Sequence, residues 1–241
     1  MNQYSSELTA VVLAGGLGTR LRPITEKVPK PLVPVKGRPF LDFLLEKIAR
    51  MGVKKCVLLV GYKGKMIEDY CKDGKTWGLK ITYSHEKEQL GTGGALVNAV
   101  THLKGAALVL NGDSYLDIDA RAFYAFHCKR NAQATVYAMQ GTLEARGEVV
   151  ADEAGRVSSF REKQSSGFGL FNTGAYIIEK RAADFLAQRV LEKKLPAAFS
   201  MEHDGFPLFV KKGWLFAHVG TGKFLDIGTF KSLEEAGEVL P

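Results

Sequence analysis

Near the start of the chain, an apolar run leads directly into a glycine-rich loop, with the sequence Val11-Val12-Leu13-Ala14-Gly15-Gly16-Leu17-Gly18-Thr19-Arg20-Leu21-Arg22-Pro23. Glycine allows backbone N–H groups to approach phosphate oxygens closely. The loop is followed by Arg20, Arg22 and Lys30. Arginine offers a planar fork to phosphate, and lysine offers a mobile point charge. The pattern predicts a strand followed by a phosphate-binding loop, with an ordinary glycine-rich turn as the alternative.

This loop differs from two common phosphate-binding motifs. No Gly-Lys-Ser/Thr sequence closes it, as a Walker loop requires, and Leu21 stands where a dinucleotide fingerprint has its third glycine. Prolines at 23, 29 and 31 also prevent a long helix from starting directly behind it. The loop therefore belongs to neither class.

Composition indicates a folded protein with one large domain. The chain has 241 residues, of which 46% are hydrophobic and 24% charged, which is typical of a globular protein. We expect a single domain over residues 1–241. Within it, we expect a first part over residues 1–130 and a second part over residues 131–241.

The net charge and the cysteine content limit the classes of binding partner and indicate the cellular compartment. The net charge is +7, but basic residues are dispersed among acidic ones, so a polyanionic small substrate accounts for the charge at least as well as nucleic acid does. Cys56, Cys71 and Cys128 are widely spaced, which favours reduced thiols. Because no apolar run is long enough for a bilayer and the start is polar, we expect no membrane association and a cytoplasmic location.

Apolar strand-like runs alternate with amphipathic stretches in the first half. The predicted strands cover 8–13, 55–60, 79–84 and 106–110, and the predicted helices cover 40–51, 63–72 and 95–103. This alternation predicts an α/β fold with a mainly parallel sheet. The second half is richer in strands. Its predicted elements are a helix at 120–129, strands at 134–139, 147–151, 157–160, 168–178 and 214–219, and a final helix from 230. We expect these strands to form a lid or annex over the edge of the sheet.

Two aspartates are candidate Mg²⁺ ligands. Asp113 directly follows an apolar strand, and ligands of parallel α/β sheets bind at the carboxyl ends of strands. Asp226 lies between apolar neighbours, just before Gly228-Thr229. Alone, each aspartate also fits a turn or a helix cap. With a phosphate-binding loop in the same chain, a shared Mg²⁺ is the better interpretation, since this ion takes few protein oxygens and completes its shell with phosphate and water.

A second glycine-rich segment, Leu90-Gly91-Thr92-Gly93-Gly94-Ala95, lies between a predicted strand and a predicted helix. Such a backbone can pack along a flat base or sugar. Glu88 precedes it, and a carboxylate accepts both neighbouring N–H donors of guanine, whereas uracil and thymine require a donor and an acceptor together. If Glu88 faces the base, guanine is favoured; a solvated acidic loop is the alternative.

Polar residues of the second half could bind a sugar phosphate. Glu162 and Lys163 follow a predicted strand, and Asn172 and Thr173 lie in the next one. Glutamate and asparagine suit sugar hydroxyls, and lysine suits a phosphate. Each residue alone is also compatible with an ordinary solvated surface.

Together these segments resemble the sugar-1-phosphate nucleotidyltransferase family, nearly from end to end. Seven blocks occur in the family's order, at 13–21, 29–31, 90–95, 111–113, 162–163, 172–174 and 226–229. The resemblance implies a Rossmann-like three-layer α/β/α sandwich with a mainly parallel mixed sheet and a small β-rich sugar-binding annex. It also implies that residues 1–130 form a nucleotide-binding core and that residues 131–241 form a sugar-phosphate-binding part with a closing metal-ligand segment.

The resemblance also implies roles for individual residues. The nucleotide-binding residues would be Leu13, Ala14, Gly15, Gly16, Gly18, Thr19, Arg20, Glu88, Gly91, Thr92 and Asp113. The sugar phosphate would be held by Gly147, Glu162, Lys163, Asn172 and Thr173. Arg20, Lys30 and Lys163 would be catalytic, and Asp113 and Asp226 would hold Mg²⁺.

Within the family, the runs at 110–117 and 224–229 are most similar to D-glycero-α-D-manno-heptose 1-phosphate guanylyltransferases, which make GDP-heptose for bacterial surface polysaccharides. Phe224 replaces a tryptophan of many relatives, and Gln89 replaces a frequent proline; both departures concern the substrate rather than the reaction. The alternatives are a mannose-1-phosphate guanylyltransferase, an N-acetylmuramate-1-phosphate uridylyltransferase and a nucleotide-sensing regulatory subunit. A homodimer is left open.

Overall fold

The computed structural model describes residues 8–143, 146–161 and 167–240. In these ranges, nine strands form one sheet with the order β10-β9-β11-β6-β1-β4-β5, and β8 pairs with β11 and β12. The strands of this sheet are β1 (Thr9–Leu13), β4 (Lys55–Val60), β5 (Lys80–His85), β6 (Ala107–Asn111), β8 (Ala134–Thr142), β9 (Glu148–Ala151), β10 (Val157–Arg161), β11 (Phe168–Ile178) and β12 (Leu215–Val219). Two short pairs lie apart from it, β2 (Pro34–Val35) with β3 (Arg38–Pro39), and β7 (Ser114–Leu116) with β13 (Phe224–Asp226).

The pairing confirms the expected mixed, mainly parallel sheet. Strand β1 runs parallel to β4 and β6, and β4 runs parallel to β5. Strand β11 is antiparallel to both β6 and β8. The predicted annex is continuous with this sheet rather than a separate lid, because the 11-residue strand β11 pairs with β6 along its second half and with β8 along nearly all of its length.

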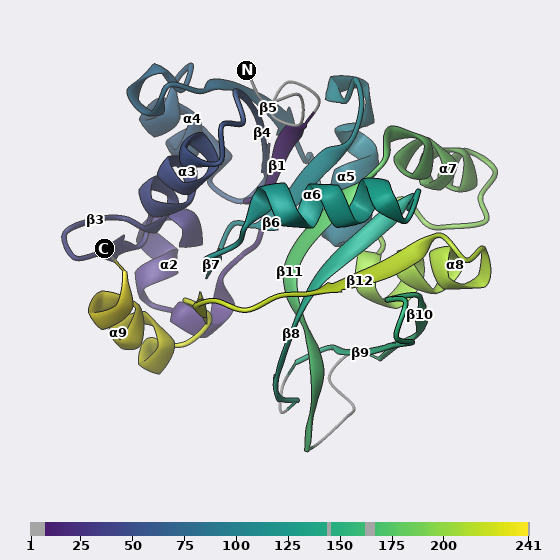
Figure 1. Cartoon of the computed structure of the whole chain (residues 1–241). Coiled ribbons are helices and arrows are strands. Elements are labelled where there is room, and N and C mark those ends of the chain that lie inside the picture. The colour runs from purple at the N-terminus through teal and green to yellow at the C-terminus, as the bar shows by residue number, and fades with distance from the viewer. Residues whose placement is uncertain (1–7, 144–145, 162–166, 241) are drawn as a thin grey trace.

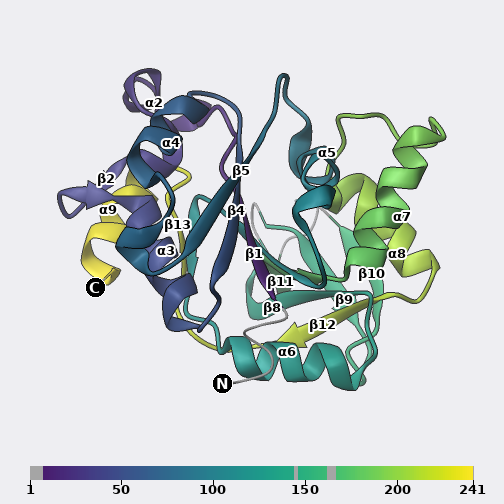
Figure 2. The ribbon, with the colours of Figure 1, turned by 90° about the horizontal axis from the view of Figure 1, so that it is seen from above.

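Helices cover both faces of the sheet, as Figures 1 and 2 show. They are α2 (Ile24–Lys27), α3 (Phe40–Arg50), α4 (Gly64–Cys71), α5 (Gly91–Asn98), α6 (Ala120–Lys129), α7 (Lys180–Leu191), α8 (Phe206–Lys211) and α9 (Phe230–Val239). Short 3₁₀ turns occur at Thr19–Leu21, Lys30–Leu32, Lys75–Trp77 and Val100–His102, and a π-helix at Met201–Gly205. The helix over 180–191 and the segment 201–211 were not predicted from the sequence.

Alternating side chains of the central strands enter two different cores. Val12 packs in a cluster with residues of α3, α4 and α6. Val11 packs on the opposite face in a cluster with residues of α5, α7 and α8. Successive side chains of a strand point to opposite faces, so a strand buried on both faces must be apolar throughout. This explains the continuous apolar runs and produces the three layers.

The C-terminal segment returns to the N-terminal half of the chain. Helix α9, drawn in yellow, lies near the β2–β3 pair in both views (Figures 1 and 2). A third apolar cluster that includes Val35, Phe40, Ile227 and Ala236 fixes this contact. Thr229 caps α9 through a capping box with Ser232, so Asp226 is not needed as the helix cap. In the described ranges, no helix is long and apolar enough to cross a membrane.

Candidate active site

The glycine-rich loop after β1 forms one wall of a cavity of about 320 Å³. The loop is packed tightly, because a Cβ atom at Gly15 would lie 2.2 Å from Oε1 of Glu86. Gly18 adopts a left-handed conformation with φ of 64°, which disfavours other residues. The cavity, called here the first cavity, is lined by Leu13, Ala14, Gly15, Gly16, Lys30, Pro31, Glu86, Gln89, Gly91, Thr92, Ala95, Asn111, Gly112 and Asp113.

Strand pairing brings Asp113 to this loop. Leu13 and Asn111 are register partners at the ends of β1 and β6. The Gly112 N–H donates to the Leu13 carbonyl at 3.0 Å, and a Cβ atom at Gly112 would lie only 2.6 Å from that oxygen. The close approach explains why glycine precedes Asp113, and it places the aspartate at the carboxyl end of the sheet as expected.

Lys30 and Asp113 form an ion pair in the first cavity. Lys30 Nζ donates to Asp113 Oδ2 at 2.5 Å. The Lys30 side chain is 10% exposed and that of Asp113 is 33% exposed. A buried lysine needs such a partner, because an unpaired buried charge is costly. The two predicted groups therefore lie together and neutralise one another.

A second cavity opens on the other side of Asp113. It has a volume of about 190 Å³ and is lined by Arg20, Asn111, Asp113, Ser114, Arg146, Gly147, Asn172, Thr173, Gly174, Glu202, Phe224 and Asp226. Asp226 reaches it because β13 pairs with β7, with Asp226 opposite Ser114. Asp226 Oδ1 accepts the Gly228 N–H at 2.6 Å. Asn111 and Asp113 line both cavities, so the two cavities meet at the end of β6.

The predicted site residues fall into clear groups. Leu13, Ala14, Gly15, Gly16, Gly91 and Thr92 line the first cavity, and Arg20, Gly147, Asn172, Thr173 and Asp226 line the second. Among the predicted site residues that the structure describes, Gly18, Thr19 and Glu88 line neither cavity. Glu162 and Lys163 lie outside the described residues. Arg20, for which the resemblance implies a nucleotide-binding role, borders the second cavity beside Gly228.

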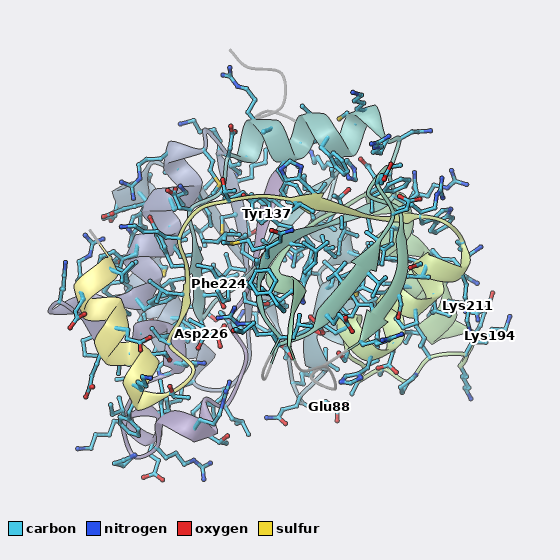
Figure 3. The ribbon with its side chains drawn as sticks, turned by 60° about the horizontal axis from the view of Figure 1, so that its bottom comes forward. Glu88, Tyr137, Lys194, Lys211, Phe224 and Asp226 are labelled. Carbon is cyan, nitrogen blue, oxygen red and sulfur yellow. The ribbon has the colours of Figure 1, made fainter. Side chains whose placement is uncertain are left out.

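Glu86, rather than Glu88, faces the first cavity. Glu88 is exposed, and Figure 3 shows it at the lower edge of the molecule, apart from Phe224 and Asp226. Glu86 directly follows β5, and its Oε2 accepts the Leu90 N–H at 3.1 Å. Burial raises the pKa of the Glu86 carboxyl, and the hydrogen bond from Leu90 partly offsets this rise. An acidic side chain therefore lines the first cavity, two residues before the one expected from the sequence.

The second glycine-rich segment forms the first turn of α5, and its last two glycines pack against the protein itself. The segment 197–201 lies across this turn, and the Gly93 N–H donates to the Phe199 carbonyl at 3.0 Å. A Cβ atom at Gly93 would lie 2.1 Å from the Phe199 ring, and one at Gly94 would lie 2.2 Å from the Ala197 carbonyl oxygen. These glycines allow close packing of two backbones, which differs from the expected contact with a base or sugar.

We expect Gly94→Ala to destabilise the fold by about 1–3 kcal/mol, because the added methyl group meets a backbone carbonyl that cannot move alone. Gly237→Ala is the matched control, since nothing lies within 4 Å of its Cβ position in α9, and alanine is favoured in a helix by about 0.5–1 kcal/mol. Urea unfolding measures both changes. Equal stability of the two variants would contradict this packing.

Two further residues of the second cavity were missed from the sequence. Arg146 directly precedes Gly147, and its guanidinium lies 4.1 Å from the ring centroid of Phe171 and 5.5 Å from that of Phe224. Glu202 belongs to the π-helix, in a segment for which no element was predicted. No local pattern distinguishes either residue, because each reaches the cavity through contacts between segments distant in sequence.

Comparison with known proteins gives the class of this fold and site. The model of the nucleotidyl transferase family matches residues 9–240. The chain belongs to the sugar-1-phosphate nucleotidyltransferase family and is an enzyme of that class.

Individual relatives are similar over most of the chain. A D-glycero-α-D-manno-heptose 1-phosphate guanylyltransferase from Campylobacter jejuni is 41% identical over 175 residues, which cover 72% of this chain and 76% of the relative. A mannose-1-phosphate guanylyltransferase from Mycobacterium tuberculosis is 35% identical over 92% of this chain and 62% of its own length. The crystal structure of HddC from Yersinia pseudotuberculosis complexed with GMP-PN matches with a TM-score of 0.81 and 32% identity, covering 95% of this chain and 98% of that one.

Proposed function

We propose that this enzyme transfers GMP from GTP to D-glycero-α-D-manno-heptose 1-phosphate, giving GDP-heptose and pyrophosphate. The observation that carries the two-substrate reaction is the meeting of two cavities at Asn111 and Asp113. The first cavity would take the nucleotide, and the second would take the sugar phosphate. The choice of heptose and guanine is supported by the relative from Campylobacter jejuni and by the GMP-PN complex of the Yersinia pseudotuberculosis protein.

The geometry favours direct attack of one substrate on the other. A phosphate oxygen of the sugar 1-phosphate forms a bond to the α-phosphorus of GTP, and the bond to the β-phosphate breaks, so that pyrophosphate leaves with the electron pair. The attacking phosphate is already anionic and needs no general base. Catalysis then depends on positioning and on charge neutralisation by Lys30 and Arg20. Lys163 would add to this neutralisation.

The carboxylates fit a magnesium ion. Asp113 and Asp226 both line the second cavity, and the β7–β13 pairing holds their segments side by side. No cluster of three or more histidine, cysteine, aspartate or glutamate residues suited to a metal occurs in the described part of the chain. Mg²⁺ needs only one or two protein carboxylates when phosphate and water complete its shell. When bound, it would neutralise charge on the phosphates.

We expect Glu86→Gln to lower the preference for GTP over UTP. A carboxylate accepts both donors on the guanine edge, whereas a carboxamide supplies one acceptor and one donor. The ratio of kcat/KM for the two nucleotides measures the change. The matched control is Glu88→Gln, which changes an exposed side chain and should leave the ratio unchanged. A shift caused by Glu88→Gln alone would instead assign base recognition to the residue expected from the sequence.

The second cavity has the charge required for a sugar phosphate. Arg146 lies against the neighbouring rings of Phe171 and Phe224, in the same cavity wall as Gly147 and Asn172. An arginine fixed in this way has little side-chain entropy left to lose when it binds an anion. Arg146 would therefore contact the phosphate or the hydroxyl groups of the sugar.

A substrate grid tests the proposal. Pyrophosphate release is measured for GTP, UTP, ATP and dTTP, each with heptose 1-phosphate, mannose 1-phosphate and N-acetylmuramate 1-phosphate. The expected result is the highest kcat/KM for GTP with the heptose. A higher kcat/KM for GTP with mannose 1-phosphate would identify a mannose-1-phosphate guanylyltransferase. This is the second candidate function, supported by the relative from Mycobacterium tuberculosis.

A further inference from the structure

One carboxylate lines the second cavity and contacts a residue of the first. Glu202 Oε2 accepts a hydrogen bond from Thr92 Oγ1 at 2.7 Å and another from Ser200 Oγ at 2.8 Å. Its Oε1 accepts the Tyr176 hydroxyl at 2.9 Å. Thr92 lines the first cavity, and Glu202 itself lines the second. The side chain of Glu202 therefore lies where the two half-sites adjoin.

The network continues into the wall of the second cavity. Asn172 Nδ2 donates to the Tyr176 hydroxyl at 2.8 Å, and Asn172 Oδ1 accepts the Gly174 N–H at 3.0 Å. Tyr176 is fully buried in β11, so its hydroxyl has a fixed position. The orientation of the Asn172 amide is thereby coupled to Glu202 through one buried tyrosine.

Hydrogen bonds also fix this network on the side of the first cavity. The Thr92 hydroxyl donates to Glu202 and also accepts the Met201 N–H at 2.8 Å. The adjoining backbone of α5 is bound to Phe199, since the N–H groups of Gly93 and Gly94 both donate to its carbonyl. The π-helix is thus attached to the first turn of α5. Single-turn π-helices are rare and occur frequently at functional sites.

We propose that Glu202 is a positioning residue that sets the nucleotide half-site and the sugar half-site in register for transfer. The proposal rests on the two-substrate function proposed above. Glu202 acts through Thr92 on one side and through Tyr176 and Asn172 on the other. Its effect is on alignment of the reacting groups, and such alignment is worth large factors in rate.

The hydrogen-bond directions require a carboxylate at this position. Among the described residues, three hydroxyl groups donate to Glu202. Tyr176 is already accepting from Asn172, which directs its own proton toward Glu202. Glutamine has the same size but replaces one acceptor oxygen with an N–H₂ donor. Glutamine therefore cannot accept all three hydrogen bonds. Either the bond from Tyr176 or the bonds from Thr92 and Ser200 must be lost.

The test is Glu202→Gln with separate measurement of binding and turnover. We expect kcat to fall by about 10- to 100-fold, the range for misplaced reacting groups. The Kd of GTP alone and of the sugar 1-phosphate alone should change far less, because each half-site keeps its own contacts. A loss of affinity that accounts for the whole loss of kcat/KM would overturn the proposal.

Two matched controls separate positioning from local structure. Asp204→Asn changes another carboxylate of the same π-helix, whose Oδ2 accepts the Ser200 N–H at 2.9 Å, and it should retain kcat. Tyr176→Phe removes only the hydroxyl link and should reproduce the kcat defect. Tyr137→Phe is the second control. It removes a hydroxyl that donates to the Thr221 carbonyl, outside this network, and it should leave kcat unchanged. If Glu202→Gln does not fold, the two tyrosine variants decide the question.

The outcomes are distinct from those of the substrate grid. If the wild-type enzyme releases pyrophosphate with none of the substrate pairs, the proposed function fails and the role of Glu202 fails with it. If the wild-type enzyme is active with any pair, that pair is used for the variants. Wild-type kcat in both Glu202→Gln and Tyr176→Phe, or an equal defect in Asp204→Asn, would then overturn only the positioning role.

Discussion

Asp113→Asn and Asp226→Asn are each expected to lower kcat by about 100-fold or more while the protein stays folded, because loss of a metal ligand removes several kcal/mol of charge stabilisation. Asparagine keeps the size of the side chain but carries no charge. The proposed Mg²⁺ would therefore be held less tightly, and the KM for Mg²⁺ should rise. Pyrophosphate release measured over a range of Mg²⁺ concentrations gives both quantities.

Asp117→Asn is the control for these two variants. Asp117 follows β7 closely and forms an ion pair with Lys47, but it lines neither the first nor the second cavity among the described residues. It should keep the wild-type rate and the wild-type dependence on Mg²⁺. Normal magnesium-dependent rates in both Asp113→Asn and Asp226→Asn would show that these carboxylates do not hold the metal.

Lys30→Met is the second change with a large expected effect. It removes the charge of Lys30 and keeps most of the side-chain volume. Without the ammonium group, the phosphates of the nucleotide lose a cation in a partly buried site, where removing one such stabilising group costs about 10²–10³-fold in kcat. Steady-state kinetics with saturating GTP and sugar 1-phosphate measure the loss. Lys30→Arg should recover little of it, because the larger guanidinium does not fit the same enclosed position.

Lys47→Met controls for the loss of a comparable ion pair. The side chain of Lys47 is 15% exposed, against 10% for Lys30, and each lysine is paired with one aspartate. Breaking either pair costs some stability, and less for Asp117, whose side chain is 58% exposed against 33% for Asp113. Only Lys30→Met should reduce kcat strongly. If kcat falls equally in Lys30→Met and Lys47→Met, the effect of Lys30 comes from reduced stability and not from a role in the reaction.

The sequence predicted the sheet well, because its central strands are buried on both faces. A run such as that of β1 must be apolar at every position, and this pattern is visible without any knowledge of its neighbours. Asp113 was correctly placed at a strand end for the same reason. Local pattern therefore locates the end of the sheet where the two cavities meet.

Contacts between distant segments could not be predicted. Glu86 and Glu88 follow the same strand in an irregular segment, so no periodicity indicates which side chain turns inward. The glycines of α5 indicate that another group lies very close to this backbone. That group is the segment around Phe199, more than one hundred residues later in the chain. Glu202 is positioned by that same segment, which carries no sequence motif. Such residues become visible only when the fold brings the segments together.

In the proposed reaction, the two substrates react directly where the first and second cavities meet. Exchange of labelled pyrophosphate into GTP tests it, with the wild-type protein, Mg²⁺ and GTP, first without and then with the nucleotide sugar that the enzyme makes. Direct transfer predicts label in GTP only when the nucleotide sugar is present, because the reverse reaction needs it. Label that enters GTP without the nucleotide sugar would reveal a nucleotidyl-enzyme intermediate and contradict direct transfer.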